Sequence, residues 1–395
     1  MMPEQKRKIL IIAGEPSGDR HAAELVYELK KYAPGIAYEG IGGDDMAEQG
    51  VKLLYHIRQM AFLGFAEVIR HLPFIRSVFR HLRKWMAAEK PLALILVDYP
   101  GFNLRLARIA GEFGVPVIYY ICPQLWAWGE KRVEKIRRYV DLPLVIFKFE
   151  EEFYARHGIP AKFVGHPLAD EIHISLSEAE FREKHKLDPD KPIVALLPGS
   201  RNNEVRKLLP MMIRTATEFR KSHEVQFIVG KASSVDREVY HIILKNTNSA
   251  AIIEKDIHHL MKYSYASLVA SGTATLESGY LGTPMVVLYR VAPLTYHIGR
   301  MLIKIENIAL ANIVSGKTVV PELIQGQLTV PNIVNALDKY FSDAVYYDNV
   351  MGELQKIKAA LGPPGAADRA AREIARFLED KYQLALSGNS ALPDK

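Results

Sequence analysis

An acidic, glycine-rich stretch near the N-terminus, Ala13-Gly-Glu-Pro-Ser-Gly-Asp19, has the residue types of a ligand-binding loop. It follows the apolar run 9–12 and precedes apolar residues at helical spacing, which predicts a strand, a loop and a helix. Such a loop directs backbone N–H groups and a helix N-terminus toward whatever binds above the strand. Because the carboxylates of Glu15 and Asp19 would repel a phosphate, the loop favours a hydroxyl-rich ligand such as a sugar. The alternative is a tight turn with a solvated Asp19 and a helix-capping Ser17.

A second candidate for chemistry is Asp98, which follows the apolar run 94–97 and precedes Tyr-Pro-Gly. The carboxyl ends of strands are the usual place for chemistry in open α/β sheets. An aspartate shielded by Tyr99 and Phe102 would have a raised pKa, which suits a general base. The alternative is an Asp98 that caps the helix beginning near Asn103.

Two other segments of the first half carry residues of interest. His166 follows the last strand expected in this half, and structural and functional roles for it remain equally open. The stretch 122–129 places two tryptophans at the end of another strand, where they are either core residues or the wall of a cleft. No cluster of His, Asp or Glu has the spacing of metal ligands, so we expect neither a metal nor a cofactor.

Two short loops in the second half each follow an apolar strand and open a helix. In the first, Gly199 would let a ligand approach the backbone, while Ser200 and Arg201 offer a hydroxyl and a guanidinium fork for phosphate. The second, 270–277, exposes helix N–H groups to an anion and places Glu277 one turn inside the helix, within reach of ribose hydroxyls. Both loops together favour a nucleotide diphosphate. Taken singly, they could be ordinary turns, and Glu277 could be a solvent-facing helix residue.

Apolar runs alternate with segments of helical spacing in both halves, which predicts parallel strands joined by crossover helices. The expected strands are 8–13, 36–41, 92–97, 115–121, 142–147 and 161–164, then 193–197, 226–229, 250–253, 267–270 and 285–288. The polar stretch 170–191 is expected to be a linker, and 332–384 to be helical with a break at 362–365. We therefore expect an α/β fold with two Rossmann-like domains that face each other across a cleft, 1–170 and 171–345. C-terminal helices (346–386) would pack back on them, and the tail 387–395 would be disordered.

The composition is that of a soluble globular protein, with 49% apolar and 24% charged residues in 395. The 51 Lys and Arg residues exceed the 45 Asp and Glu residues, which favours anionic partners. The single Cys122 excludes a disulfide within the chain and suits a reducing compartment. With neither a signal peptide nor an apolar run long enough to span a bilayer, the expected compartment is the cytoplasm.

A basic amphipathic segment lies within residues 60–84. Five Lys or Arg residues and no acid occur from Arg70 to Lys84, and apolar residues recur at helical spacing from 68 to 86. With the apolar stretch 60–65, the segment suits peripheral contact with anionic membrane lipid. The equally acceptable alternative is a core-packed helix with a solvated basic face. A second basic run is 131–138; nucleic acid is disfavoured for both runs because interleaved aromatic residues are missing.

Taken together, these motifs closely resemble the lipid-A-disaccharide synthase family, inverting glycosyltransferases of the two-domain GT-B architecture. The stretches that carry the resemblance are AGEPSGD (13–19), GIGG (40–43), VDYPGFN (97–103), CPQLWAWGEKRV (122–133), VGHPL (164–168), LLPGSR (196–201), ASGTATLE (270–277), and ANIVSGK (311–317) with VPEL (320–323). They occur in the family's order through about 310 residues.

The resemblance implies transfer from UDP-2,3-diacylglucosamine to 2,3-diacylglucosamine 1-phosphate, with release of UDP, on the cytoplasmic face of the inner membrane. Asp98 would deprotonate the acceptor 6-hydroxyl. The residues implied at the diphosphate are Ser200, Arg201, Ser271, Gly272 and Thr273. Glu277 would bind the ribose, and Asn312 would lie at the nucleotide end of the cleft. Those implied on the sugar side are Gly14, Glu15, Ser17, Gly18 and Asp19, with Asn103 and His166 nearby. A homodimer is compatible with the pattern.

Two other classes share parts of the pattern. A peptidoglycan N-acetylglucosaminyltransferase or a UDP-sugar 2-epimerase would share the second-half loops, but the stretches 13–19 and 97–103 argue against both. A non-catalytic protein that binds lipid or nucleotide sugar would keep the loops and would need no base at Asp98.

Overall fold

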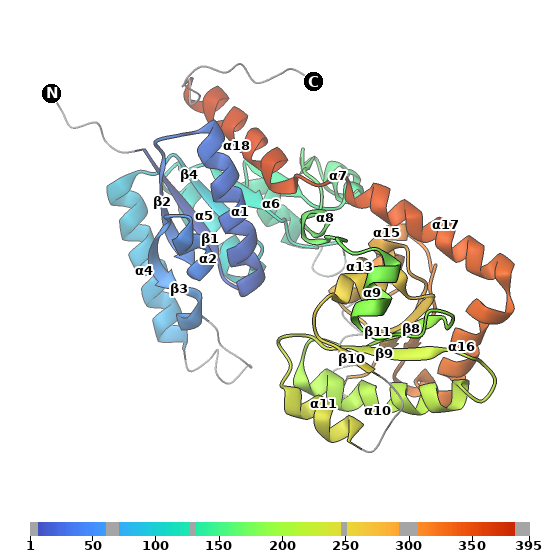
Figure 1. Cartoon of the computed structure of the whole chain (residues 1–395). Coiled ribbons are helices and arrows are strands. Elements are labelled where there is room, and N and C mark those ends of the chain that lie inside the picture. Colours follow the sequence, from blue (N-terminus) through green and yellow to red (C-terminus); the bar gives the residue numbers. More distant parts are fainter. Residues whose placement is uncertain (1–6, 61–70, 127–131, 246–250, 292–306, 384–395) are drawn as a thin grey trace. The chain divides into compact units, whose positions relative to one another are not determined.

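The computed structural model describes residues 7–60, 71–126, 132–245, 251–291 and 307–383 (Figure 1). The chain forms two compact units: unit 1 comprises Met1–Asp170 and Pro363–Lys395, and unit 2 comprises Glu171–Gly362. The expected C-terminal segment 346–386 is divided, because α17 (Ala344–Leu361) belongs to unit 2 and α18 (Ala366–Tyr382) to unit 1.

Unit 1 is built on a parallel sheet of seven strands in the order β3-β2-β1-β4-β5-β6-β7. The strands are β1 (Lys8–Ala13), β2 (Ala37–Gly42), β3 (Lys52–His56), β4 (Ala93–Val97), β5 (Val117–Tyr120), β6 (Leu142–Val145) and β7 (Lys162–Phe163). The order reverses direction between β1 and β4, and ligands bind at such a switch point in open α/β sheets. The edge strand β3 was not expected from the sequence.

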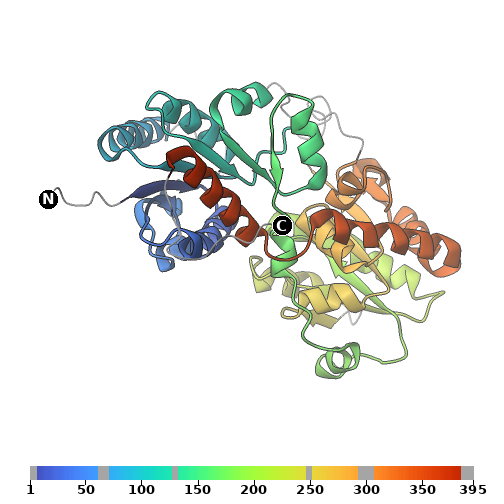
Figure 2. The ribbon, with the colours of Figure 1, turned by 90° about the horizontal axis from the view of Figure 1, so that it is seen from above.

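Helices cover both faces of this sheet, with α1 and α18 together on one face (Figure 2). The helices are α1 (Pro16–Tyr32), α2 (Asp44–Glu48), α4 (Leu72–Glu89), α5 (Pro100–Gly111), α6 (Val133–Tyr139), α7 (Lys148–Ala155), α8 (Leu168–Glu171) and α18, with the 3-10 turn η1 (Ile57–Gln59). Successive side chains of β1 enter two different cores, as the alternation of a strand requires. Ile9 and Ile11 pack with α1 and α18, whereas Leu10 and Ile12 pack with α4 and α5.

The apolar side of α4 is part of the second core. Val78, Leu82, Trp85 and Met86 are buried there, and the Phe79 ring stacks on that of Phe102 with centroids 4.4 Å apart. Core packing therefore accounts for the apolar residues between 72 and 86. This is what the interpretation of the segment as a core-packed helix with a solvated basic face requires. Residues 61–70, which include the rest of the apolar stretch, lie outside the described residues.

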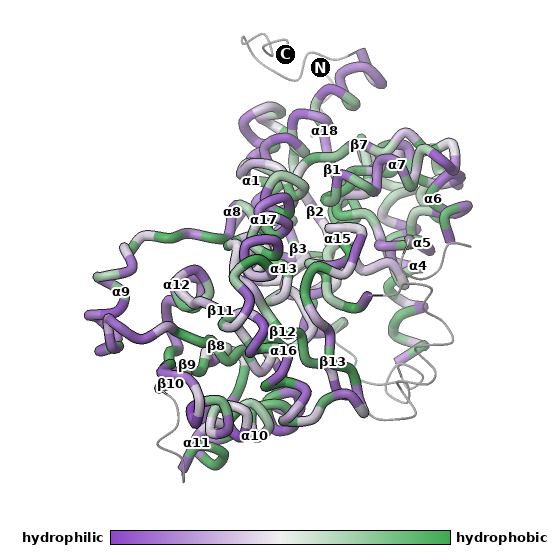
Figure 3. Tube along the Cα trace, turned by 90° about the vertical axis from the view of Figure 1, so that its right-hand side faces the viewer, coloured by the Kyte–Doolittle hydropathy of each residue, from purple (hydrophilic) through white to green (hydrophobic). Residues whose placement is uncertain are grey.

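Unit 2 contains a parallel sheet of six strands in the order β10-β9-β8-β11-β12-β13. The strands are β8 (Ile193–Leu197), β9 (Gln226–Gly230), β10 (Ala251–Ile253), β11 (Ala266–Ala270), β12 (Met285–Tyr289) and β13 (Glu322–Ile324). The helices are α9 (Glu178–Lys184), α10 (Asn202–Phe219), α11 (Arg237–Leu244), α12 (Ile257–Tyr263), α13 (Thr273–Leu281), α15 (Leu310–Ser315), α16 (Val330–Ser342) and α17, with the 3-10 turn η3 (Gln325–Gln327). The central strands of both sheets are predominantly hydrophobic (Figure 3), as strands buried on both faces must be.

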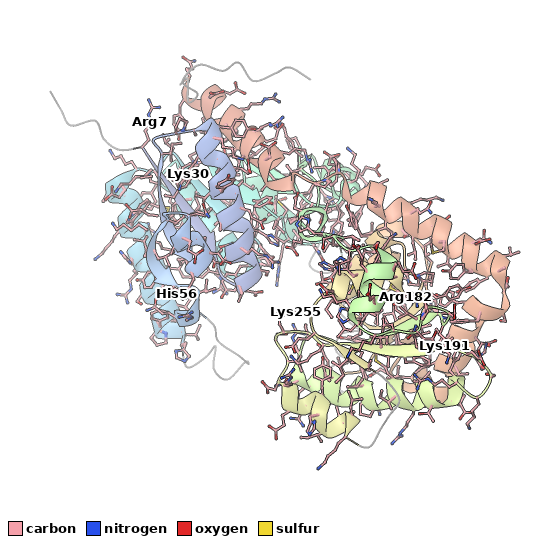
Figure 4. All side chains as sticks on the ribbon, viewed as in Figure 1. Arg7, Lys30, His56, Arg182, Lys191 and Lys255 are labelled. Carbon is pink, nitrogen blue, oxygen red and sulfur yellow. The ribbon has the colours of Figure 1, made fainter. Side chains whose placement is uncertain are left out.

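The prediction of a linker at 170–191 was wrong in part, because α9 forms within it and packs on unit 2. Ser177 and Glu180 form a capping box at its N-terminus, which holds the helix at its first turn. Phe181 is fully buried, and Arg182 donates hydrogen bonds to the carbonyls of Asp188 and Lys191, 2.7 and 3.1 Å away (Figure 4). Within the described residues, no helix combines the length and apolar composition of a membrane span.

Candidate active site

Asp98 lies in a turn with unusual backbone geometry between β4 and α5. Asp98 and Tyr99 both have left-handed backbone angles, with φ of 45° and 48°, which costs energy for residues other than glycine. Side chains nearby hold this turn in place: the Asn103 amide donates to the carbonyls of Val97 and Asp98 at 3.2 and 2.7 Å, and the Tyr119 hydroxyl donates to that of Asp98 at 2.6 Å. The main chain of Asp98 is thereby fixed at the carboxyl end of β4.

Asn103 is fully buried, so its side chain positions the turn from below. Both hydrogen bonds that Asn103 donates go to main-chain carbonyls, which gives this residue a positioning role, and its contact with substrate stays a prediction.

The loop at 13–19 lies against this turn. A Cβ atom on Gly14 would lie 2.2 Å from the Tyr99 ring, so only glycine allows the two segments to approach this closely. Burial raises the pKa of Asp98, and the negative charge of Glu15 raises it further, while the Tyr99 backbone hydrogen bond and His21 act in the opposite direction. The structure thus brings Glu15 and Asp98 together. Glu15 and Ser17 are exposed, and Gly18 packs on Ala13 beneath them.

Asp19 has a different role from the one expected. It is only 3% exposed, and its carboxylate accepts hydrogen bonds from the backbone N–H groups of Gly43, Asp45 and Met46 at 2.6, 3.1 and 3.3 Å. Three such donors leave the carboxylate little capacity for a sugar hydroxyl. Asp19 therefore fastens the start of α2 to the glycine-rich loop, and its contact with a sugar stays a prediction.

His166 is held in its neutral form. Burial, with a smaller contribution from the nearby His21, lowers its pKa to about 3. Its Nδ1 atom accepts a hydrogen bond from the N–H of Leu168 at 3.0 Å, and its ring lies 4.9 Å from that of Phe147. A neutral imidazole in this place can donate or accept a hydrogen bond, but it offers no positive charge to a phosphate group.

The segment after β5 is anchored by a buried carboxyl group that sequence reasoning missed. Glu150 is fully buried and accepts hydrogen bonds from the Trp126 indole at 2.9 Å and from the N–H groups of Ile146 and Phe147 at 3.2 and 3.1 Å. Burial raises its pKa to about 7. Cys122 is also buried, so this part of the CPQLWAW stretch is core-packed; Trp128 lies outside the described residues.

A pocket of about 600 Å³ opens beside the two loops of unit 1. Gly14, Glu15 and Tyr99 line it, and so do Asp44, His56 and Arg58 from α2, the end of β3 and η1. Figure 4 labels His56 at the end of β3. The sequence pattern does not indicate His56 and Arg58, because the residues of β3 are half-buried or exposed and do not form a clear apolar run.

In unit 2, the loops after β8 and β11 lie at the same edge of the sheet, because these strands are neighbours. Gly199 has a φ of 114°, and a Cβ atom there would lie 2.5 Å from the Glu204 carboxylate. Arg201 is the N-cap residue of α10; its side chain is 80% exposed and pairs with Glu204 at 3.0 Å. Ser200 is exposed beside it. A guanidinium this accessible is free to bind a phosphate group.

The start of α13 supplies the second loop. Gly272 and Thr273 are exposed at its N-terminus, whereas the Ser271 hydroxyl donates to the carbonyl of Ile308 at 3.4 Å. Glu277 follows one turn later, with 21% of its side chain exposed and the His258 ring 3.7 Å away. An anion at the helix N-terminus and a diol at Glu277 are chemically compatible with this arrangement.

Asn312 forms hydrogen bonds within the protein. Its side chain is fully buried; Nδ2 donates to Val320 O and Glu322 Oε1 at 2.9 and 2.8 Å, and Oδ1 accepts from the N–H groups of Val319 and Val320 at 2.8 and 2.9 Å. All four hydrogen-bonding positions of the amide are thus used within the protein. Asn312 thus shapes the loop before β13, and its place at the nucleotide end of the site stays a prediction. Across the described ranges, no group of three or more His, Cys, Asp or Glu residues is arranged to hold a metal ion.

Two parallel α/β sheets, each with glycine-containing loops at its carboxyl edge, define the GT-B class of fold. The fold matches the crystal structure of the calicheamicin glycosyltransferase CalG4, with a TM-score of 0.62, 15% identity, and coverage of 96% of this chain and 99% of that one. It also matches a UDP-GlcNAc 2-epimerase from Neisseria meningitidis bound to UDP-GlcNAc, with a TM-score of 0.57, 14% identity, and coverage of 94% and 100%.

The chain belongs to the lipid-A-disaccharide synthetase family, whose model matches residues 9–370. It is 39% identical over 380 residues to the lipid-A-disaccharide synthase of Geobacter sulfurreducens, covering 96% of this chain and 99% of the relative. It is also 39% identical over 373 residues to the synthase of Myxococcus xanthus, with coverage of 94% and 97%. The protein is therefore a glycosyltransferase of lipid A biosynthesis.

Proposed function

We propose that this chain transfers 2,3-diacylglucosamine from UDP to the 6-hydroxyl of 2,3-diacylglucosamine 1-phosphate, with inversion at the anomeric carbon. The products are the β(1→6) disaccharide 1-phosphate and UDP. The observation that carries this proposal is Asp98, whose main chain is fixed at the end of β4 and whose carboxyl group has a pKa raised by burial and by Glu15. Such a group is suited to general base catalysis.

In this reaction Asp98 takes the proton of the acceptor 6-hydroxyl as the oxygen attacks the anomeric carbon. The new C–O bond forms on the face opposite to the bond that breaks, and the electron pair of the broken bond leaves with the UDP β-phosphate. In-line displacement of this kind inverts the anomeric configuration. Glu15 contributes by keeping the basicity of Asp98 higher than that of an ordinary aspartate.

The loops of unit 2 would bind the leaving group. Arg201 and the N–H groups at Gly272 and Thr273 would stabilise the negative charge that develops on the diphosphate. Glu277 would accept hydrogen bonds from the ribose hydroxyls. The exposure of Arg201, Gly272 and Thr273 supports these assignments.

We further propose that unit 1 contacts anionic lipid of the inner membrane through the basic face formed by α4, α5 and α6. These helices cover the same side of the sheet, and the exposed cations on them are Arg76, Arg80, Arg83, Lys84, Arg105, Arg108, Lys135, Arg137 and Arg138. Arg83 forms an ion pair with Glu112, and Arg137 forms one with Glu134, each at 2.7 Å. The other cations give the face a net positive charge. Both basic runs found in the sequence thus lie on one surface, which attracts a negatively charged leaflet.

The proposed reaction is tested by measuring UDP release from UDP-2,3-diacylglucosamine with and without 2,3-diacylglucosamine 1-phosphate. We expect release only with the acceptor, together with a tetra-acylated β-linked disaccharide. UDP release from UDP-N-acetylglucosamine, or interconversion of that sugar with its C2 epimer, would instead favour a different reaction on the same fold.

A further inference from the structure

A second pocket of unit 1 opens on the basic face, where α5 and α6 pack side by side and Phe79 of α4 lies next to them. Its volume is about 570 Å³. Sites for small molecules typically enclose about 300 to 1,000 Å³, so the pocket has room for more than a bare ion. It shares no lining residue with the pocket beside Tyr99, and the proposed reaction assigns it no role.

Two cations from each of α5 and α6 line this pocket: Arg105, Arg108, Lys135 and Arg138. The two members of each pair are three residues apart, so they lie on the same face of their helix. All four are exposed, and no ion pair joins them to any other residue in the described ranges. The Arg138 guanidinium lies 5.6 Å from the centre of the Tyr139 ring, a contact that leaves its N–H groups free of a carboxylate.

The two carboxylates that line the pocket are engaged by cations outside its lining. Glu112 pairs with Arg83, and Glu134 pairs with Arg137, with 2.7 Å between nitrogen and oxygen in each pair. Because these carboxylates are already compensated, the four lining cations keep their positive charge. An anion that enters the pocket therefore meets a net positive potential.

The remaining lining residues are apolar or aromatic: Phe79, Leu104, Ile109 and Tyr139. Leu104 is buried and the other three are half-buried, whereas the cations are exposed, so the pocket has an apolar floor below a cationic rim. A free phosphate ion gains nothing from such a floor. An amphiphile with a phosphate group buries apolar surface on the floor while its phosphate accepts charge-assisted hydrogen bonds at the rim.

We propose that this pocket binds the headgroup phosphate of one anionic phospholipid, with the first acyl carbons on the apolar floor. The inference rests on the proposed membrane contact of unit 1 and goes beyond it, because a defined site replaces a diffuse attraction to negative charge. Arg105 and Arg108 supply planar forks for the phosphate oxygens, and Lys135 and Arg138 add positive charge from α6.

The test uses the full-length protein and dihexanoylphosphatidylglycerol at concentrations at which this lipid is monomeric, with binding followed by calorimetry. The wild type should bind one lipid per chain. Arg105→Gln with Arg108→Gln should weaken the binding by at least about 10-fold, because charge-assisted hydrogen bonds are lost. Arg105→Lys with Arg108→Lys keeps the charge and loses the forks, so the affinity should fall by less.

The matched control is Arg76→Gln with Arg80→Gln, which removes two exposed arginines of the same basic face that do not line the pocket. It should leave the affinity for monomeric lipid nearly unchanged. An equal loss in the control and in Arg105→Gln with Arg108→Gln would overturn the pocket in favour of a diffuse basic face. Inorganic phosphate that binds as tightly as the lipid would overturn the assignment to a phospholipid.

Co-sedimentation of the wild type with anionic vesicles separates this inference from the proposal on which it rests. Binding to vesicles without binding to monomeric lipid would overturn the pocket and leave the membrane contact intact. Binding to neither would refute the membrane contact, and the pocket with it. The glycosyl transfer is tested independently, by UDP release.

Discussion

At the scale of single residues, backbone strain and buried charge coincide at the carboxyl ends of β4 and β5. Asp98, Tyr99 and Ile121 have φ values of 45°, 48° and 58°, and none of them is glycine. Ile121 is β-branched, for which this conformation is especially unfavourable. Residues held in such conformations cluster at functional sites, where the surrounding structure stabilises them. Here the stabilising groups are Asn103 and Tyr119, which both bind the main chain of the Asp98 turn.

The influence of Glu15 on Asp98 can be measured through pH dependence. A base must be ionised, so kcat/KM should rise with pH through the raised pKa of Asp98. Glu15→Gln removes a negative charge beside it, which lowers that pKa and moves the acid limb of the profile to lower pH. The control is Glu28→Gln, on α1, where Glu28 is paired with Lys31. It should leave the acid limb of the profile in place. A limb that stays fixed or moves to higher pH in Glu15→Gln would contradict this coupling.

Part of the site could be predicted from residue types and part could not. Asp98 was found because a buried strand ends directly before it, and strand ends are visible in the sequence. Asp19 and Asn312 were assigned to the ligand, but their partners are backbone groups at 43–46 and at 319–320, together with Glu322. No local pattern reveals which distant loop will supply such partners.

At the scale of elements, the expected strands agree with the observed ones where both faces are buried. β1 and β8 have the expected bounds, because five of the six residues of β1 and all five of β8 are buried and the apolar runs are continuous. The edge strands β3 and β13 were missed, since their residues are half-buried or exposed and their apolar content is diluted. The short α9 was missed because its capping box lies within a polar stretch that resembles a linker.

The basic face of α4, α5 and α6 gives a prediction for these elements. Replacing Arg76, Arg80 and Arg105 by Glu should weaken binding to vesicles of anionic phospholipid by at least about 100-fold, since each cation contributes ~1 kcal/mol. Co-sedimentation with vesicles at low salt measures this. Lys30→Glu with Lys31→Glu, on α1 at the other face, is the control and should have a much smaller effect. Unchanged binding in the triple variant would place the membrane contact elsewhere on the protein.

At the scale of the whole molecule, the chain leaves unit 1 after Asp170 and re-enters it at Pro363, and these two places are bound together. The Asp170 carboxylate accepts from the N–H groups of Gly365 and Ala366 at 2.5 and 3.1 Å. Arg369 of α18 donates to the carbonyls of Val164, Pro364 and Pro363 at 2.7, 2.8 and 2.6 Å. The C-terminal helix thus fastens the segment that carries His166.

Removing this fastening should destabilise unit 1. Arg369→Met leaves three carbonyl groups without their donor, and we expect a loss of about 2 kcal/mol in the free energy of unfolding. Trp85, Trp126 and Trp128 are the three tryptophans of the chain and all belong to unit 1, so urea unfolding followed by tryptophan fluorescence reports on this unit. The control is Arg376→Met. Arg376 also lies on α18, but its contact is a long ion pair with Glu373, 3.7 Å between Nη1 and Oε1. Equal stability of the two variants would show that the contacts of Arg369 contribute little.

The central claim, that Asp98 is the base for glycosyl transfer, is tested most directly by Asp98→Asn. The variant keeps the shape of the side chain and removes its basicity, so kcat should fall by ~10²- to 10⁴-fold. The affinity for UDP, measured by calorimetry on the same preparation, should stay unchanged, because the nucleotide loops belong to unit 2. Turnover close to that of the wild type, with UDP binding intact, would contradict the role of Asp98 as base.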